Sequence, residues 1–222
     1  MRLDRLIKSQ KRWGKRQVRD LLEAGEVRVN GVIVESASTL IGKFDLVELS
    51  DKVLQSKTRR TVMLNKPSGV VSATRDAEHE TVIDLIKERW AGELHLAGRL
   101  DRFTTGLVIL TNDSSLSESL TEPEQKVGKV YLVGTDKPIT SKMITVFQNG
   151  MRFAKENVTT APAQVELMND RKCRLTIYEG KHHQVKRMFA RFDIKVVSLH
   201  RERVGEFDLG DLSSGEWRVL DL

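Results

Sequence analysis

The sequence contains very little cysteine and no long apolar segment. Cys173 is the only cysteine among 222 residues, so no disulfide can form within the chain and a reducing cytoplasm is the expected environment. No apolar run approaches the ~20 residues needed to cross a bilayer. Residues 1–5 (MRLDR) begin a charged segment rather than the apolar core of a secretory signal. We therefore expect a cytoplasmic protein without a membrane span.

Motifs that hold cofactors are also missing. No glycine-rich phosphate loop is present, and no dinucleotide-binding fingerprint follows an apolar strand pattern. The five histidines are scattered, and the adjacent His182 and His183 are poorly placed to hold one metal ion together. We expect neither a metal nor an organic cofactor.

Positive charge is concentrated in the first quarter of the chain. Residues 1–60 contain fourteen Lys and Arg against eight Asp and Glu, so they account for the whole net charge of +6. Residues 61–222 are balanced. A local surplus of this kind is typical of a protein that binds a polyanion, although a charged run more commonly marks a solvated helix. We favour RNA, because so dense a cluster repels itself unless phosphates neutralise it.

The first fifty residues have the pattern of a small module with two helices and a sheet. Residues 3–7 and about 15–24 have the apolar spacing of helices. Residues 27–34 form two β-branched runs joined by Asn-Gly, which is a strong hairpin signal, and residues 45–49 would add a third strand. Residues 51–60 are polar and lack periodicity, which predicts a linker.

This module resembles the S4-type RNA-binding domain. The resemblance rests on residues 2–4 and 15–31 (KRQVRDLLEAGEVRVNG) and covers about residues 1–50. It implies a surface for folded RNA on the second helix and the adjoining loop. It implies nothing about catalysis, since ribosomal proteins carry the same module. The basic side chains that we expect to contact RNA are Lys8, Lys15, Arg16 and Arg19.

Residues 61–222 alternate short strands with a few helices. This order is typical of an α+β domain with a mixed, mostly antiparallel sheet, rather than of regular βαβ units. Strands are expected at 61–64, 70–72, 94–97, 107–111, 129–134, 163–168, 173–178 and 195–200, and helices at 81–89, 140–149 and 182–192.

A polar loop stands between two of the expected strands. In residues 98–113 (GRLDRFTTGLVILTND), Asp101 lies between Gly98 and Gly106. Loops held by rigid strands commonly carry catalytic groups. Taken alone, Asp101 is more simply a turn residue that pairs with Arg99 on the surface.

Four segments together resemble the pseudouridine synthases that carry an S4-type domain. Residues 98–113 look like the signature loop of that family, and residues 63–74 (MLNKPSGVVSAT) look like its opening strand and loop. Residues 175–189 (LTIYEGKHHQVKRMF) and 196–205 (VVSLHRERVG) look like its later motifs. The last two segments are most similar to the RsuA type, which modifies small-subunit (16S) ribosomal RNA. Relatives that act on large-subunit (23S) RNA share most of the rest.

The chain departs from the family pattern at two positions. Phe103 stands where the family often has Asp, and Ser114 stands where a Gly is usual. Neither change removes a catalytic group, but Phe103 could alter how the loop meets the RNA.

The resemblance implies that the protein isomerises a uridine of ribosomal RNA to pseudouridine without a cofactor. Asp101 would be the nucleophile. A nearby cation helps a carboxylate shielded from water to stay ionised, and Lys186 matches the basic position that pairs with the nucleophile in the family, with Arg187 as the second choice. Tyr131 matches a tyrosine that stacks on the target base, and Arg99 matches an arginine that fills the gap left by the extruded base. Arg102, Thr105 and His183 lie in the same motifs and are expected to contact RNA.

Two other functions stay open at this point. One is a non-catalytic S4-type protein of ribosome assembly. The neutral domain of residues 61–222, with its carboxylate loop, argues against this function. The other is a hydrolase that uses Asp101 with His183 or His200, although neither histidine has an identifiable orienting partner. We expect a monomer of three parts, 1–50, 51–60 and 61–222, that binds ribosomal RNA either free or within an assembly particle.

Overall fold

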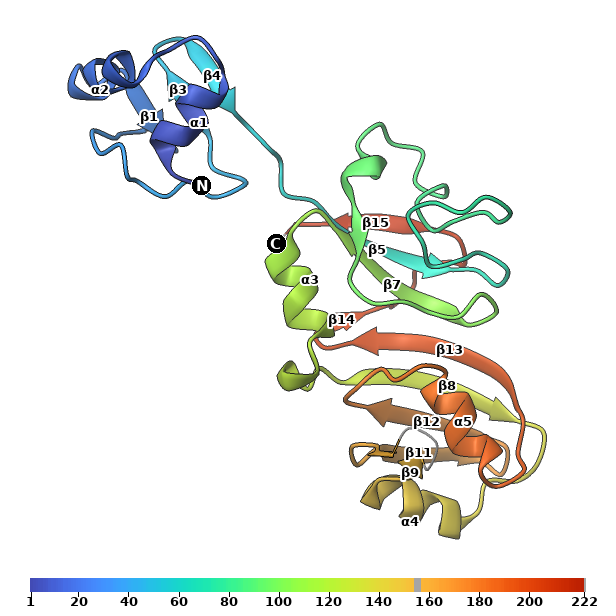
Figure 1. The fold of residues 1–222 in the computed structure, drawn as a ribbon. Helices are drawn as coiled ribbons and strands as arrows, with labels where there is room; N and C mark the ends of the chain where they lie inside the picture. Colours follow the sequence, from blue (N-terminus) through green and yellow to red (C-terminus); the bar gives the residue numbers. More distant parts are fainter. Residues whose placement is uncertain (154–156, 222) are drawn as a thin grey trace. The chain divides into compact units, whose positions relative to one another are not determined.

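The computed structural model describes residues 1–153 and 157–221, and the chain divides into two compact units, residues 1–59 and 60–222 (Figure 1). Each unit has a hydrophobic core of its own. In the described ranges, no helix combines the length and the apolar character that crossing a membrane requires.

The smaller unit packs two helices against a four-stranded sheet with the spatial order β2-β1-β3-β4. The apolar stripe of each helix faces this sheet, since Leu3, Ile7 and Leu22 are fully or almost fully buried. The elements are α1 (Leu3–Ser9), α2 (Lys15–Glu23), β1 (Val27–Val29), β2 (Val32–Ile33), β3 (Val47–Leu49) and β4 (Lys52–Gln55).

Local sequence signals explain most of this unit. Asn30 and Gly31 both adopt the left-handed backbone conformation that the two-residue turn between β1 and β2 requires. Strand β4 lies inside residues 51–60, where the sequence predicts a linker. It belongs to the sheet because it pairs with β3 and Leu54 packs against the core.

The larger unit is built on a nine-stranded sheet (Figure 1). The strands follow the order β11-β12-β8-β13-β7-β5-β15, with β14 paired to β13 and β6 paired to β7. Among the described strands, every pair is antiparallel except β7 with β13. The expected α+β fold with a mixed, mostly antiparallel sheet is confirmed. The strands of this sheet are β5 (Thr61–Lys66), β6 (His95–Leu96), β7 (Thr105–Thr111), β8 (Lys129–Thr135), β11 (Gln164–Asn169), β12 (Lys172–Ile177), β13 (Val196–Val204), β14 (Phe207–Asp208) and β15 (Trp217–Leu220).

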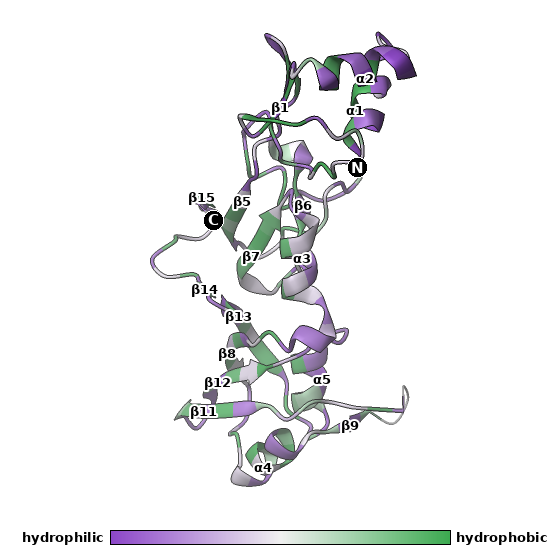
Figure 2. Ribbon diagram, turned by 90° about the vertical axis from the view of Figure 1, so that its left-hand side faces the viewer, coloured by the Kyte–Doolittle hydropathy of each residue, from purple (hydrophilic) through white to green (hydrophobic). Residues whose placement is uncertain are grey.

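Cores lie on both faces of this sheet, because successive residues of a strand point to opposite sides. On β7, Val108 and Leu110 join one core, whereas Leu107 and Ile109 join the other. The first core includes residues of α4 and α5, and the second includes Leu120 of α3. Figure 2 shows the hydrophobic character of the central strands. The remaining elements are the helices α3 (Ser114–Thr121), α4 (Ser141–Asn149) and α5 (Gln184–Ala190), the 3₁₀ turns η1 (Ala91–Glu93) and η2 (Pro123–Gln125), and the separate hairpin of β9 (Arg152–Phe153) and β10 (Val158–Thr159).

Two expected elements are absent from the described structure. Residues 81–89 form turns rather than a helix, because the Asp84 carboxylate accepts hydrogen bonds from the backbone and hydroxyl of Thr81. Residues 70–72 form no strand and contribute only a single bridge between Val71 and Thr81. Helix α3 was not expected. Its sequence, SSLSESLT, has weak helix formers, but the Asp113 side chain caps its first turn.

Candidate active site

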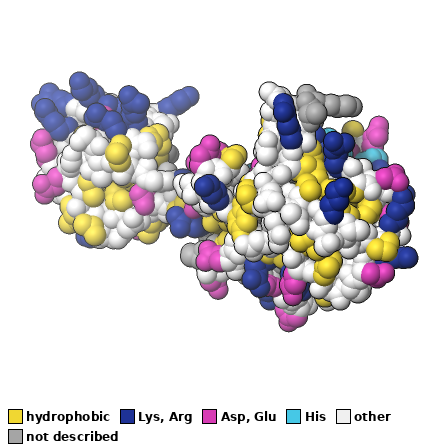
Figure 3. Space-filling model, turned by 90° about the horizontal axis from the view of Figure 1, so that it is seen from below, with side chains coloured by type: hydrophobic (Ala, Val, Ile, Leu, Met, Phe, Trp, Pro, Cys, Tyr) yellow, Lys and Arg dark blue, Asp and Glu magenta, His cyan; other side chains and the backbone are white. Residues whose placement is uncertain are grey.

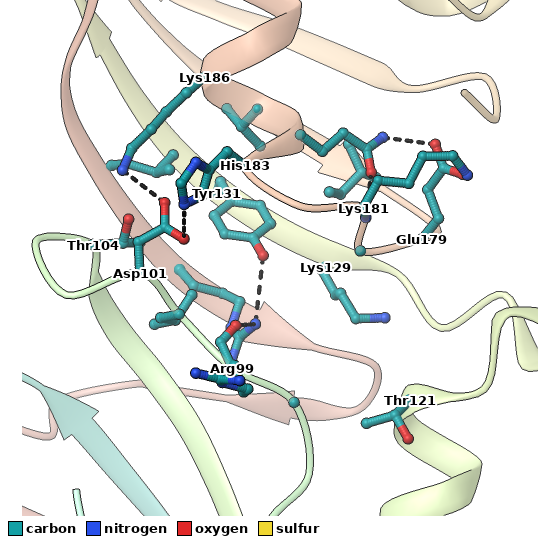
Figure 4. Close-up of a pocket in the computed structure, with 18 of the residues that line it drawn as sticks. Arg99, Asp101, Thr104, Thr121, Lys129, Tyr131, Glu179, Lys181, His183 and Lys186 are labelled. Carbon is teal, nitrogen blue, oxygen red and sulfur yellow. Dashed lines mark hydrogen bonds and ion pairs between the residues drawn. The ribbon is translucent and has the colours of Figure 1, made fainter. Parts of the chain in front are cut away.

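A pocket of about 420 Å³ opens between the catalytic loop, strands β8 and β13, and the start of α5 (Figure 4). We use the name catalytic loop, after the role expected from the sequence, for residues 97–104, which join β6 to β7. The pocket brings together residues about a hundred positions apart, such as Asp101 and Arg201. Its lining also includes Arg99, Thr104, Lys129, Tyr131, Glu179, His183, Gln184 and Lys186.

Asp101 is held between two donors from α5 and its cap. Lys186 Nζ lies 2.7 Å from Asp101 Oδ2, and His183 Nε2 lies 3.2 Å from Asp101 Oδ1. The Asp101 side chain is 30% exposed, so it is shielded but still open to the pocket. A carboxylate placed in this way is oriented by its neighbours and remains accessible to a substrate.

The turn into α5 aims these donors. His183 precedes the helix in a left-handed conformation, and its ring stacks on His182 with a centroid separation of 3.8 Å. The buried Gln184 donates to Glu179 Oε1 at 2.7 Å and accepts from the backbone of Lys181 at 3.0 Å. These bonds fix residues 179–184, so Lys186, less than one turn further on, reaches Asp101.

Lys66, at the end of β5, holds the catalytic loop through hydrogen bonds to backbone carbonyl groups. It is fully buried, and its Nζ donates to the carbonyl oxygens of Pro67, Val70 and Arg102 at 2.7–2.9 Å. Burial lowers the pKa of Lys66 from 10.5 to about 8, against the opposing effect of the Asp101 charge. The loop is thus tied to β5 immediately after Asp101.

Gly106 brings β13 against the end of this loop. It pairs with Arg201 in the parallel register between β7 and β13, and its φ is +102°. A Cβ at this position would lie 2.3 Å from the Arg201 carbonyl oxygen, so only glycine allows the approach. The close contact sets Arg201 beside the catalytic loop.

Arg201 links three parts of the pocket wall. It is 2% exposed, and its Nε donates to the Leu107 carbonyl at 2.8 Å. One Nη donates to the Tyr131 hydroxyl and to the Arg99 carbonyl, each at 3.4 Å. Tyr131 is itself 7% exposed, so its ring is fixed in the wall and its hydroxyl faces a cation.

The expected catalytic residues Asp101, Tyr131 and Lys186 lie in this one pocket, together with Arg99 and His183. Three other expected residues direct their side chains elsewhere. Arg102 donates to the Gly69 carbonyl, Thr105 bonds to His200, and Arg187 lies 4.0 Å from the centre of the Phe153 ring.

Sequence reasoning missed three cations of the site. Lys66 and Arg201 lie inside the quoted segments 63–74 and 196–205, but their roles depend on carbonyl oxygens far away in sequence. Lys129 also lines the pocket, where burial and the nearby Arg201 charge lower its pKa. A lysine at the end of an apolar strand pattern is the sequence signal that could have identified Lys66.

The smaller unit has a basic surface around α1 and α2. A depression of about 510 Å³ lies between these helices, and the exposed Lys15, Arg16 and Arg19 line it together with the half-buried Lys8. Figure 3 shows Lys and Arg side chains gathered along one edge of this unit. Lys8 pairs with Asp4 at 3.5 Å, and Arg19 pairs with Glu23 at 3.5 Å, which leaves a net positive surface.

Comparison with known proteins matches both units. A family model described as RNA pseudouridylate synthase matches residues 60–191, and one described as S4 domain matches residues 1–47. A ribosomal small subunit pseudouridine synthase A from Pseudomonas aeruginosa is 45% identical over 100% of this chain and 97% of its own. Its counterpart from Escherichia coli is 40% identical over 99% and 96%.

A solved structure described as a pseudouridylate synthase gives the same result. It is 37% identical, with a TM-score of 0.71 over 100% of this chain and 96% of its own. The chain therefore belongs to the RNA pseudouridylate synthase family, whose members are enzymes that isomerise uridine in RNA. The resemblance of the four motifs and of the amino-terminal module is confirmed.

Proposed function

We propose that this protein converts a uridine of small-subunit ribosomal RNA to pseudouridine, with Asp101 as the nucleophile. The observation that carries the proposal is the Asp101 carboxylate, held by Lys186 and His183 on the wall of a pocket that also contains Tyr131. The choice of small-subunit RNA is supported by the names of the relatives that match almost the whole chain.

The reaction breaks the bond between N1 of uracil and C1′ of ribose and forms a bond between C5 and C1′. The proton leaves C5 and N1 gains one, so the product is an isomer and no oxidant or group donor is consumed. A carboxylate suits the first half, because it can attack the nucleotide or stabilise positive charge at C1′. Asp101 is the one carboxylate of the catalytic loop that lines the pocket.

Lys186 and Tyr131 assist at different stages. Lys186 places a positive charge 2.7 Å from the Asp101 carboxylate and restrains the rotation of that carboxylate. Tyr131 offers a fixed ring against which the uracil can turn, and its hydroxyl accepts a hydrogen bond from Arg201. With Arg201 donating to the phenol oxygen, the phenol is in a position to take up or pass on the C5 proton.

The smaller unit would dock the RNA. Lys8, Lys15, Arg16 and Arg19 surround one depression and can contact phosphates without reading the bases. Such contacts offset part of the few kcal/mol needed to extrude the target uridine. Because phosphates are present in free RNA and in an assembly particle, these contacts are compatible with either substrate.

Carbodiimide mapping of pseudouridine tests the proposal. Small-subunit RNA, large-subunit RNA and small-subunit assembly particles from cells that lack the enzyme are incubated with the protein. We expect one new adduct, in the small-subunit RNA. An adduct in large-subunit RNA alone would overturn the substrate, and no adduct in any of the three would overturn the function.

A further inference from the structure

Phe103 exposes most of its ring, although it belongs to the catalytic loop. Its exposed fraction is 69%, and no other Phe, Tyr or Trp within residues 1–153 and 157–221 is as open to solvent. Single exposed apolar side chains are common on protein surfaces. Exposure alone therefore assigns no role to this ring. The contact that holds the ring and the place of Phe103 in the loop are better guides to its role.

One contact holds the Phe103 ring, and further contacts hold Arg102, the residue that makes it. The Arg102 guanidinium lies over one face of the ring, 5.3 Å from its centroid. Arg102 is held in turn, because its side chain donates to the Gly69 carbonyl at 3.1 Å and lies 2.9 Å from His79 Nε2. Its carbonyl accepts from Lys66 Nζ at 2.9 Å. Arg102 thus covers one face of a ring that is otherwise open to solvent.

Phe103 belongs to a loop of which several other residues line the pocket. Asp101 and Thr104, on either side of Phe103 in sequence, both line the pocket. At about 3.8 Å between successive Cα atoms, the Cα of Phe103 is within about 8 Å of that of Asp101. A nucleotide joined directly to one that reacts at Asp101 would therefore lie near Phe103.

We propose that Phe103 stacks on the base next to the extruded uridine. This inference rests on the proposed function. Extrusion leaves the neighbouring base with one bare face, at a cost of a few kcal/mol. Stacking of a base on an aromatic side chain is worth about 1–3 kcal/mol, which is enough to compensate for the missing neighbour. Through this stacking, Phe103 contributes to which RNA this chain prefers.

A set of substitutions separates stacking from simple apolar contact. Phe103→Ala and Phe103→Leu should lower kcat/KM for the substrate ribosomal RNA about 10- to 100-fold, whereas Phe103→Trp should keep most of the activity. Val197→Ala is the matched control, since Val197 is an exposed apolar side chain of β13 outside the pocket lining. Thermal unfolding should be unchanged in every variant, because the substituted side chains are exposed.

A double-mutant cycle then tests the contact itself. Synthetic RNA carries an abasic site on the 5′ or the 3′ side of the modified uridine. At one of these positions, removing the base should abolish the loss of kcat/KM caused by Phe103→Ala, because the base that stacks on the ring is already absent. An equal penalty on intact RNA and on both abasic RNAs would overturn the inference, as would full activity of Phe103→Leu. The proposed function would fail differently, by inactivity of the unaltered protein on every RNA.

Discussion

At the scale of single residues, the chemistry depends most on Asp101. Asp101→Asn keeps the shape of the side chain and loses its charge and nucleophilicity. We expect single-turnover rates to fall by on the order of 10³-fold or more, while RNA affinity changes little. Asp211→Asn serves as the control, because Asp211 is 94% exposed and pairs with Arg218 outside the pocket. A rate within about tenfold of the unaltered enzyme would remove Asp101 from the role of nucleophile.

The neighbouring cations Lys186 and Arg187 should differ sharply. Lys186 reaches Asp101 at 2.7 Å, whereas Arg187 stacks on Phe153. We expect Lys186→Met to lower kcat by about 10- to 100-fold, which corresponds to about 1–3 kcal/mol of lost stabilisation. Arg187→Met should change kcat much less, as measured at saturating RNA. Equal losses in the two variants would show that the ion pair between Lys186 and Asp101 is not the one that matters for the reaction.

Lys66 should give folding stability a distinct pH dependence. The unfolded chain keeps the Lys66 proton up to a pKa near 10.5, whereas burial lowers the folded pKa to about 8. Between these values the unfolded state binds more protons, so the free energy of unfolding should rise with pH, by up to about 3 kcal/mol from this group. Below pH 8 the cost of the buried charge is fully present.

Urea unfolding between pH 8 and pH 10.5 measures this contribution. Lys66→Met removes the titrating group, so the difference in stability between the unaltered protein and the variant should increase with pH. A difference that stays constant across this range would mean that the Lys66 charge is not buried in solution.

At the scale of the elements, the contact between β7 and β13 assembles the pocket. Gly106→Ala would place a methyl group 2.3 Å from the Arg201 carbonyl oxygen, in a left-handed backbone position. We expect the free energy of unfolding to fall by at least about 2 kcal/mol, and the melting temperature by about 5 °C or more. Activity should fall with it, because Arg201 would move away from Tyr131.

Gly92→Ala is the control for this change. Gly92 lies in η1, where an added Cβ meets nothing within 4 Å. Melting curves of the two variants would show whether the loss at Gly106 comes from the close strand contact. If Gly106→Ala melted like Gly92→Ala, the tight approach of β13 would not exist in solution.

The sequence predicts elements well where local signals and burial agree. The turn at Asn30 and Gly31 and most strands of the larger unit follow from turn chemistry and apolar runs. The prediction of a helix over residues 81–89 was wrong. Val82 and Ile86 are both buried and have the spacing of a helical apolar stripe, but hydrogen bonds to Asp84 hold this segment in turns. The hydrogen bonds from Lys66 to Arg102 and from Arg201 to Leu107 could not be predicted, since these two backbone carbonyls are brought near only by the folded sheet.

At the scale of the whole molecule, the positive charge of the smaller unit should control RNA affinity. Lys15, Arg16 and Arg19 are exposed on α2. Changing all three to Gln should weaken RNA binding and reduce the slope of log K against log[salt] by roughly 0.7–0.9 for each phosphate that the protein no longer neutralises. The rate at saturating RNA should be nearly unchanged, because the chemical groups lie in the other unit.

A second triple variant controls for net charge. Lys142, Arg171 and Lys195 are exposed in the larger unit, and changing them to Gln removes the same charge outside the pocket. Filter binding over a range of salt concentrations compares the two variants. Identical salt slopes would indicate that RNA responds only to total charge and does not contact α2.

The parallel pairing of β7 with β13 has a consequence for synthesis on the ribosome. Strand β13 fits between β8 and β7, yet it leaves the ribosome about a hundred residues after Asp101. Because β13 begins about 60 residues after β8 ends, the nascent chain carries both strands with open edges for about 3–12 s at 5–20 residues per second. During this interval the edges can pair with other chains, and the pocket still lacks Arg201. The insertion of β13 therefore covers these two strand edges and completes the wall of the pocket in the same late step.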